Sequence, residues 1–173
     1  MTSSHLTEVL ELWRKVSRLL KENNIDSVLV GGAVATVYTQ GKYETKDLDL
    51  VIDGTHEEVR MIMTNNHFKK CNGYYLHEDY AITIDFITGY LEIGYDCNLT
   101  PVIDSESGFK ILTPTDCIKD RLSSFLYQEK GPENERKGLN VAKLIATKHT
   151  IDKNEVKNWC KGEGAEEVYN KLF

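Results

Sequence analysis

The segment Asp47-Leu48-Asp49-Leu50 constrains the fold most strongly, because acidic and apolar residues alternate along it. Alternation with a period of two is typical of a strand that lays one face on a core. We therefore expect the leucines to face the core and the two carboxylates to lie side by side on the opposite face. Neighbouring carboxylates repel each other unless a positive group lies between them. Mg²⁺ accepts such a pair, whereas two solvated strand acids are the alternative interpretation.

A short apolar strand is expected over residues 27–30, and it runs directly into Gly31-Gly32 and a helix over residues 33–39. Glycines let the backbone approach a ligand closely, and the start of a helix offers unpaired N–H groups that bind phosphate well. Gly31 and Gly32 are therefore candidate phosphate contacts. A tight strand-to-helix turn without a ligand would need the same two residues, so both interpretations stay open.

A third acid, Asp85, lies in an apolar run over residues 81–87, in which every second residue from 82 to 86 is apolar. Asp85 is expected on the opposite face of this strand. An acid buried in such a strand is costly without a partner. A cation shared with Asp47 and Asp49 would compensate this cost, whereas an acid on the solvated face of an edge strand would need no compensation.

The pattern of residues changes at Thr113-Pro114, a helix cap followed by proline at the first helical position. Only helices are expected after this point. Before it we expect helices from Ser3 or Ser4 to Asn23-Asn24 and over residues 55–65, and further short strands over 74–76, 81–87, 91–93 and 109–112. The interpretation is an α+β chain, with a mixed sheet flanked by helices over residues 1–112 and a small helical subdomain over residues 113–173.

Charge and composition narrow the range of partners. The net charge of −6 weighs against binding extended nucleic acid, because phosphate contacts need clustered lysine and arginine. Contact with one nucleotide or one RNA end stays open. The four cysteines are scattered singly, which is typical of a reducing compartment, and neither a membrane-spanning run nor a signal peptide is recognisable. We therefore expect a cytoplasmic protein with no membrane partner.

The glycine turn and the three acids together resemble the nucleotidyltransferase superfamily, which includes DNA polymerase beta, tRNA CCA-adding enzymes, aminoglycoside nucleotidyltransferases and prokaryotic toxin nucleotidyltransferases. The superfamily combines a glycine turn, a paired acid on the next strand and a third acid on a later strand. The matching segments are Val28-Leu29-Val30-Gly31-Gly32, Thr45-Lys46-Asp47-Leu48-Asp49-Leu50-Val51 and Ile84-Asp85-Phe86. The resemblance covers roughly the first half of the chain and implies a polymerase-beta-like fold.

The resemblance also implies an activity. It predicts an enzyme that moves a nucleoside monophosphate from an NTP to a hydroxyl of RNA, tRNA, a protein or a small molecule. By this resemblance Asp47 and Asp49 hold two metal ions, Mg²⁺ or Mn²⁺, and Asp85 holds the one that activates the acceptor hydroxyl. Gly31 and Gly32 would contact the triphosphate. Further candidate contacts are Lys46, Lys119, Arg121 and Lys143, although solvated surface charges would explain each of them.

Residues 112–122 resemble the segment that opens the helical part of abortive-infection-type toxin nucleotidyltransferases. Those proteins commonly have lysine where Arg121 stands, and they carry acids on the next helix, where this chain has Arg136-Lys137-Gly138-Leu139-Asn140. The chain is therefore closer to small prokaryotic proteins of the same superfamily than to the toxins. A non-catalytic module that binds a nucleotide or a protein partner, within a toxin–antitoxin system, is the alternative.

Overall fold

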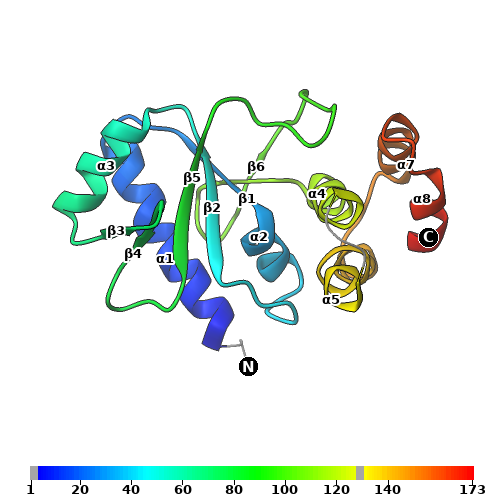
Figure 1. The fold of residues 1–173 in the computed structure, drawn as a ribbon, viewed down its shortest axis with the longest axis horizontal. Coiled ribbons are helices and arrows are strands. Elements are labelled where there is room, and N and C mark those ends of the chain that lie inside the picture. Colours follow the sequence, from blue (N-terminus) through cyan, green and yellow to red (C-terminus); the bar gives the residue numbers. More distant parts are fainter. Residues whose placement is uncertain (1–3, 128–130) are drawn as a thin grey trace. The chain divides into compact units, whose positions relative to one another are not determined.

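The computed structural model describes residues 4–127 and 131–173, and the chain divides into two compact units (Figure 1). The first unit comprises Met1–Tyr90 and Pro101–Ile111, and the second comprises Leu91–Thr100 and Leu112–Phe173. One unit boundary thus lies where the residue pattern changes. The segment Leu91–Thr100 belongs with the C-terminal helices, because the indole Nε1 of Trp159 donates a hydrogen bond to the carbonyl of Ile93 at 2.9 Å.

The first unit is built on a mixed sheet, which has seven strands among the described residues. Their order across the sheet is β3-β4-β5-β2-β1-β7-β6. β2 lies in the middle, antiparallel to β1 and parallel to β5. The strands are β1 Ser27–Val30, β2 Asp47–Ile52, β3 Lys69–Cys71, β4 Tyr74–Leu76, β5 Thr83–Thr88, β6 Val102–Ile103 and β7 Lys110–Ile111.

The helices of the first unit are α1 Ser4–Glu22, α2 Gly31–Tyr38 and α3 His56–Asn65. Figure 1 shows α2 on the opposite side of β2 from α3. α3 begins at a capping box, in which the Thr55 hydroxyl accepts from the Glu58 N–H and the Glu58 carboxylate accepts from the Thr55 N–H. α1 buries an apolar stripe at helical spacing, which includes Val9, Trp13 and Leu20.

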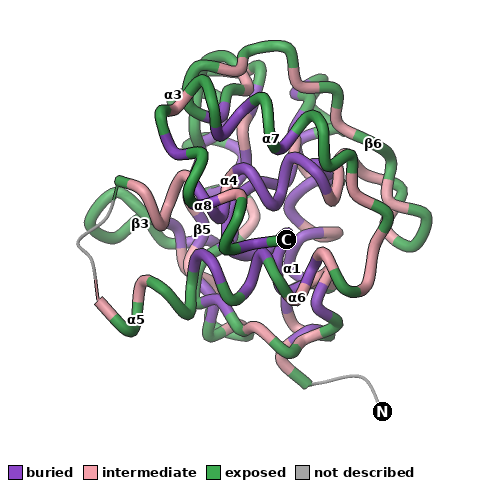
Figure 2. Tube along the Cα trace, turned by 90° about the vertical axis from the view of Figure 1, so that its right-hand side faces the viewer, coloured by how far each residue is buried: buried purple, intermediate pink, exposed green. Residues whose placement is uncertain are grey.

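The second unit consists of the non-helical segment Leu91–Thr100 and a group of helices that lie after Thr113, where the sequence predicts helices. It contains α4 Pro114–Tyr127, α5 Pro132–Glu135, the π-helical turn η1 Arg136–Asn140, α6 Val141–Lys148, α7 Lys153–Gly162 and α8 Glu166–Leu172. Figure 2 shows both buried and exposed residues along α7 and α8, whereas no residue of α5 is buried. η1 packs closely on α4, because a Cβ at Gly138 would lie 3.0 Å from the carbonyl oxygen of Arg121. In the described part of the chain, no helix is both long enough and apolar enough to cross a membrane.

The strand predictions need three corrections. Residues 91–93 form no strand: Ile93 makes only an isolated bridge to Asp96, and the segment lies in the helical unit. The strands β3 and β6 are missing from the prediction. Both lie at the edges of the sheet and all their residues are exposed, so neither shows the alternation that identifies a half-buried strand in a sequence.

Candidate functional site

The three predicted acids lie on one face of the sheet. Asp49 of β2 is the register partner of Asp85 in the parallel strand β5, and Asp47 precedes Asp49 by two residues. Paired residues of parallel neighbours, and residues two apart on one strand, project from the same face. The opposite face of the same strands carries the buried residues Leu48, Leu50, Ile84 and Phe86. Asp49 and Asp85 are half-buried, and Asp47 is exposed.

The first glycine of the turn makes room for one of these acids. β1 passes directly into α2 at Gly31, whose φ of 70° lies in the left-handed region. A Cβ added to Gly31 would overlap the Asp49 carboxylate oxygen and lie 3.2 Å from the Asp49 Cγ. The carboxylate of Asp49 therefore lies against the first residue of α2, the end of a helix that favours negative charge. The N-cap residue of α2 is Val30, whose side chain makes no capping hydrogen bond.

The second glycine makes room for Thr45, just ahead of β2. A Cβ added to Gly32 would lie 2.5 Å from the Thr45 hydroxyl oxygen. That hydroxyl donates a hydrogen bond to Asp47 Oδ1 at 2.6 Å. The turn therefore contacts β2 twice, at Asp49 directly and at Asp47 through Thr45. The sequence left open whether these glycines contact a ligand or form a tight turn without one. In the structure, each glycine makes room for a side chain of β2 or of the residue just ahead of it.

The predicted basic contacts are distributed over both units. Lys46 is exposed beside the acids in the first unit, and its carbonyl accepts from the Thr83 N–H at 3.0 Å. Lys143 is exposed on α6 of the second unit. Arg121 of α4 is largely buried, and its Nη2 lies 2.6 Å from the Asp120 carboxylate. The role of these three residues in contacting a phosphate stays a prediction.

Lys119, the fourth predicted basic contact, forms ion pairs within the second unit. Its side chain is fully buried, and its Nζ lies 2.7 Å from carboxylate oxygens of Asp96, Asp116 and Glu155. An ammonium has three N–H donors, so each carboxylate takes one. Burial alone would lower the pKa of Lys119, but the three hydrogen bonds outweigh it and raise the pKa above its ordinary value. Sequence reasoning missed this cluster because Asp96 and Glu155 lie far from Lys119 along the chain.

These three acids also form the only group of three or more metal-ligating side chains within 4.8 Å of one another in the described part of the chain. The group is not a candidate metal centre, because the lysine ammonium already occupies the position between the carboxylates. The carboxylate oxygens of Asp47, Asp49 and Asp85 are more widely spaced, because they do not all lie within 4.8 Å of one another. An open set of this kind leaves space for phosphate oxygens and water among the ligands of a cation.

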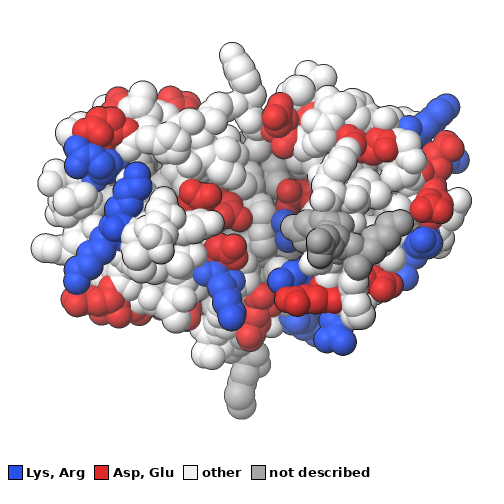
Figure 3. Space-filling view, in the orientation of Figure 1, with Lys and Arg blue, Asp and Glu red and all other residues white. Residues whose placement is uncertain are grey.

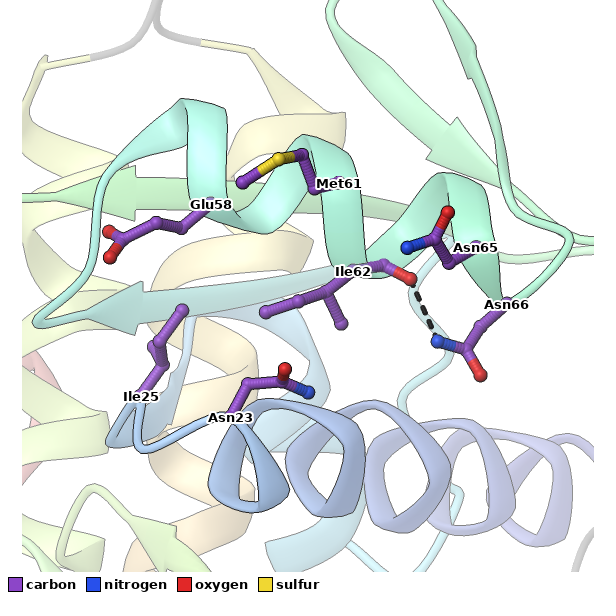
Figure 4. Close-up of a pocket in the computed structure, with 7 residues that line it drawn as sticks. All are labelled: Asn23, Ile25, Glu58, Met61, Ile62, Asn65 and Asn66. Atoms are coloured by element: carbon purple, nitrogen blue, oxygen red, sulfur yellow. Dashed lines mark hydrogen bonds between the residues drawn. The ribbon is translucent and has the colours of Figure 1, made fainter.

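A pocket of about 390 Å³ lies elsewhere in the first unit, between the end of α1 and α3 (Figure 4). None of the three acids lines it. Glu58 is already used in the capping box, and Asn66 Nδ2 donates to the carbonyl of Ile62 at 2.8 Å. We assign no chemistry to this pocket, whose lining residues are Asn23, Ile25, Glu58, Met61, Ile62, Asn65 and Asn66.

Comparison with proteins of known structure identifies the fold. No family model matches the chain, and no curated protein matches its sequence. Among solved structures, it is similar to an antigenic nucleotidyltransferase-like protein from Paracoccidioides brasiliensis, with a TM-score of 0.65 and 13% identity over 99% of this chain and 94% of that chain. It is also similar to the antibiotic-resistance factor ANT(2'')-Ia, with a TM-score of 0.54 and 14% identity over 99% of this chain and 91% of that chain.

A second structure of that resistance factor, in complex with adenylyl-2''-tobramycin, gives a TM-score of 0.53 and 16% identity over 94% of each chain. Identities this low carry information on the fold rather than on the reaction. The similar structures nevertheless span nearly the whole chain, including the sheet that carries the three acids. The protein therefore has the nucleotidyltransferase fold, as the glycine turn and the three acids predict.

Proposed function

We propose that this protein is a metal-dependent nucleotidyltransferase, which moves a nucleoside monophosphate from an NTP to a hydroxyl group and releases pyrophosphate. The observation that carries the proposal is the placement of Asp47, Asp49 and Asp85 on one face of the sheet, with Asp49 against the N-terminus of α2. The three carboxylates and the N-terminus of α2 therefore lie close together. Carboxylates can hold the cations, and a helix N-terminus can bind the triphosphate.

The donor set fits a hard divalent cation, because all three side chains offer carboxylate oxygens. Asp47 and Asp49 would hold two ions, and Asp85 would hold one of them. When bound, Mg²⁺ or Mn²⁺ neutralises charge on the phosphates and activates the acceptor hydroxyl. Asp85 would accept the proton of that hydroxyl. Backbone N–H groups at Gly31 and Gly32 would orient the triphosphate, with Lys46 of the same unit as a further contact, whereas the engaged ammonium of Lys119 is left out.

The acceptor class is open to experiment. The resistance factor with a similar fold was solved with adenylyl-2''-tobramycin, which favours including small-molecule hydroxyls beside tRNA, other RNA and proteins. A non-catalytic nucleotide-binding module is the second candidate. The engagement of Lys119 by three acids favours it, because one predicted triphosphate contact is lost.

The test is a transfer assay with Mg²⁺ and each α-labelled NTP, in the presence of tRNA, a protein extract or an aminoglycoside. We expect label on an acceptor and release of pyrophosphate with the wild-type protein. Asp47→Asn and Asp49→Asn should both abolish transfer, because each removes a carboxylate charge that the cations need. Asp79→Asn is the matched control, since Asp79 is an exposed aspartate of the first unit that is not one of the three acids, and its Oδ2 lies 3.5 Å from the Nδ1 of His77. This variant should keep full activity.

Transfer that persists in both Asp47→Asn and Asp49→Asn would refute the site. Mg²⁺-dependent binding of an NTP without transfer to any acceptor would favour the non-catalytic module instead. Binding is measured separately, by fluorescence of a labelled NTP analogue, so that the two outcomes are distinguished.

A further inference from the structure

We infer that Thr45 is a positioning residue for Asp47, and that its hydroxyl holds one carboxylate oxygen so that the other is directed to the cation. This inference rests on the proposed function. It concerns a residue that contacts an acid of the site without itself contacting substrate or metal.

The hydrogen bonds of Thr45 are the first support. Thr45 is only 5% exposed, although Asp47, two residues further on, is exposed. The Thr45 hydroxyl donates to Asp47 Oδ1 at 2.6 Å and accepts from the Asp47 backbone N–H at 3.4 Å. An exposed aspartate at the first position of a strand would otherwise lose rotamer freedom when it binds a cation. A buried donor removes that freedom before the cation arrives.

The contact with the glycine turn is the second support. A Cβ on Gly32 would lie 2.5 Å from the Thr45 hydroxyl oxygen and 3.1 Å from the Thr45 Cβ. The hydroxyl can therefore occupy its position only because residue 32 has no side chain. This packing fixes Thr45 against the N-terminus of α2, and so fixes Asp47 relative to the backbone proposed to hold the triphosphate.

The residue type suits the role. The β-branched side chain of threonine restricts χ1, so the direction of the hydroxyl is set by packing. A neutral donor orients the carboxylate without neutralising it, whereas a lysine at the same place would compete with the cation for Asp47. Hydrogen bonds of this kind to metal-binding carboxylates orient the ligands and contribute to metal affinity.

The experiment compares Thr45→Val, which keeps the shape and removes the hydroxyl, with Thr45→Ser, which keeps the hydroxyl. Mn²⁺ affinity is measured without nucleotide by electron paramagnetic resonance, and kcat and KM for the NTP are measured separately. We expect Thr45→Val to bind Mn²⁺ about 10- to 100-fold more weakly, with a fall in kcat larger than the change in KM. Thr45→Ser should stay within about threefold of the wild-type affinity, because its donor is retained.

Thr39→Val is the matched control for lost stability. Thr39 is fully buried in the same unit, and its hydroxyl accepts from the Tyr43 N–H at 3.1 Å. Removing the Thr39 hydroxyl should lower the melting temperature of the protein and leave its Mn²⁺ affinity unchanged. If Thr45→Val does not fold, Gly32→Ala gives an independent test, because its Cβ must displace the Thr45 hydroxyl and should weaken Mn²⁺ binding in the same way.

The outcomes separate the two proposals. Weaker Mn²⁺ binding in Thr45→Val, together with a wild-type protein that transfers label to no acceptor, would support the role of Thr45 and refute the transfer activity. Transfer by the wild type with unchanged Mn²⁺ affinity and kcat in Thr45→Val would refute the role of Thr45 and leave the activity standing. A wild-type protein that binds no Mn²⁺ would overturn both.

Discussion

At the scale of single residues, Gly31 meets two separate constraints. Its φ of 70° is a backbone conformation that residues with a Cβ adopt at a cost. The space beside it is also filled by the Asp49 carboxylate. We predict that Gly31→Ala lowers the free energy of unfolding by more than the backbone term of about 1–2 kcal/mol, because the methyl group must also displace that carboxylate. Urea denaturation measures this loss.

Gly108→Ala is the control for that measurement. Gly108 has a φ of 75°, close to that of Gly31, and no heavy atom beyond its two chain neighbours lies within 4 Å of the position of its Cβ. This variant reports the backbone cost alone. Equal losses in the two variants would show that Asp49 moves aside freely, and that the glycine is required by the turn alone.

The sequence singled out Gly31 and Gly32 as candidate ligand contacts, but it did not predict their close approach to Asp49 and Thr45. A glycine pair between a strand and a helix indicates close approach of something to the backbone. Which group approaches depends on the register between β1 and β2, where Val30 pairs with Asp49. That register is a long-range property, so a contact between Gly31 and Asp49 cannot be read from spacing.

At the scale of elements, Lys119 joins α4, α7 and the segment Leu91–Thr100 through its three carboxylate partners. We predict that Lys119→Met lowers the free energy of unfolding at pH 7 by about 3–5 kcal/mol, because three acids are left without their cation. Lys110→Met is the control. Lys110 forms a half-exposed pair with Asp26, and its loss should cost no more than about 1 kcal/mol.

The difference between wild type and Lys119→Met should shrink as the pH is lowered from 7. In the wild type, burial disfavours the charged form of Asp96, but hydrogen bonds from Lys119 and the Asn98 N–H outweigh it and lower the pKa below the ordinary 3.8. The stability that this gives is present above 3.8 and is lost as the pH falls through the lowered pKa. In Lys119→Met, protonation instead relieves repulsion. Urea denaturation at a series of pH values tests this, and a constant difference would contradict it.

Elements with a strong internal period were predicted from the sequence, and elements held by distant contacts were not. β2 and the apolar stripe of α1 show their periods directly in the sequence. The sequence predicts a strand over residues 91–93, yet the whole segment Leu91–Thr100 belongs to the helical unit. The bond from Trp159 to Ile93 and the ion pair from Lys119 to Asp96 hold it there. Local strand or helix propensity does not predict contacts between residues that lie this far apart in the sequence.

At the scale of the whole molecule, the charge limits the acceptors that the proposed reaction would use. The net charge is −6, and acidic and basic side chains are interspersed over the face drawn in Figure 3. Tracking a nucleic-acid backbone needs a continuous row of lysine and arginine. The charge distribution therefore favours an acceptor that presents a single hydroxyl at an RNA end or on a small molecule.

We predict that single-stranded RNAs of 10 and 50 nucleotides bind with the same affinity per 3′ end. The affinity should depend weakly on salt, with a slope of log K against log salt no steeper than about −2, because fewer than about three phosphates would be neutralised. Fluorescence anisotropy of end-labelled RNA between 50 and 200 mM salt measures both quantities. Affinity that rises with length, with a slope near −5, would instead reveal an extended basic groove. Polymeric RNA would then become the favoured acceptor, despite the acidic balance of the chain.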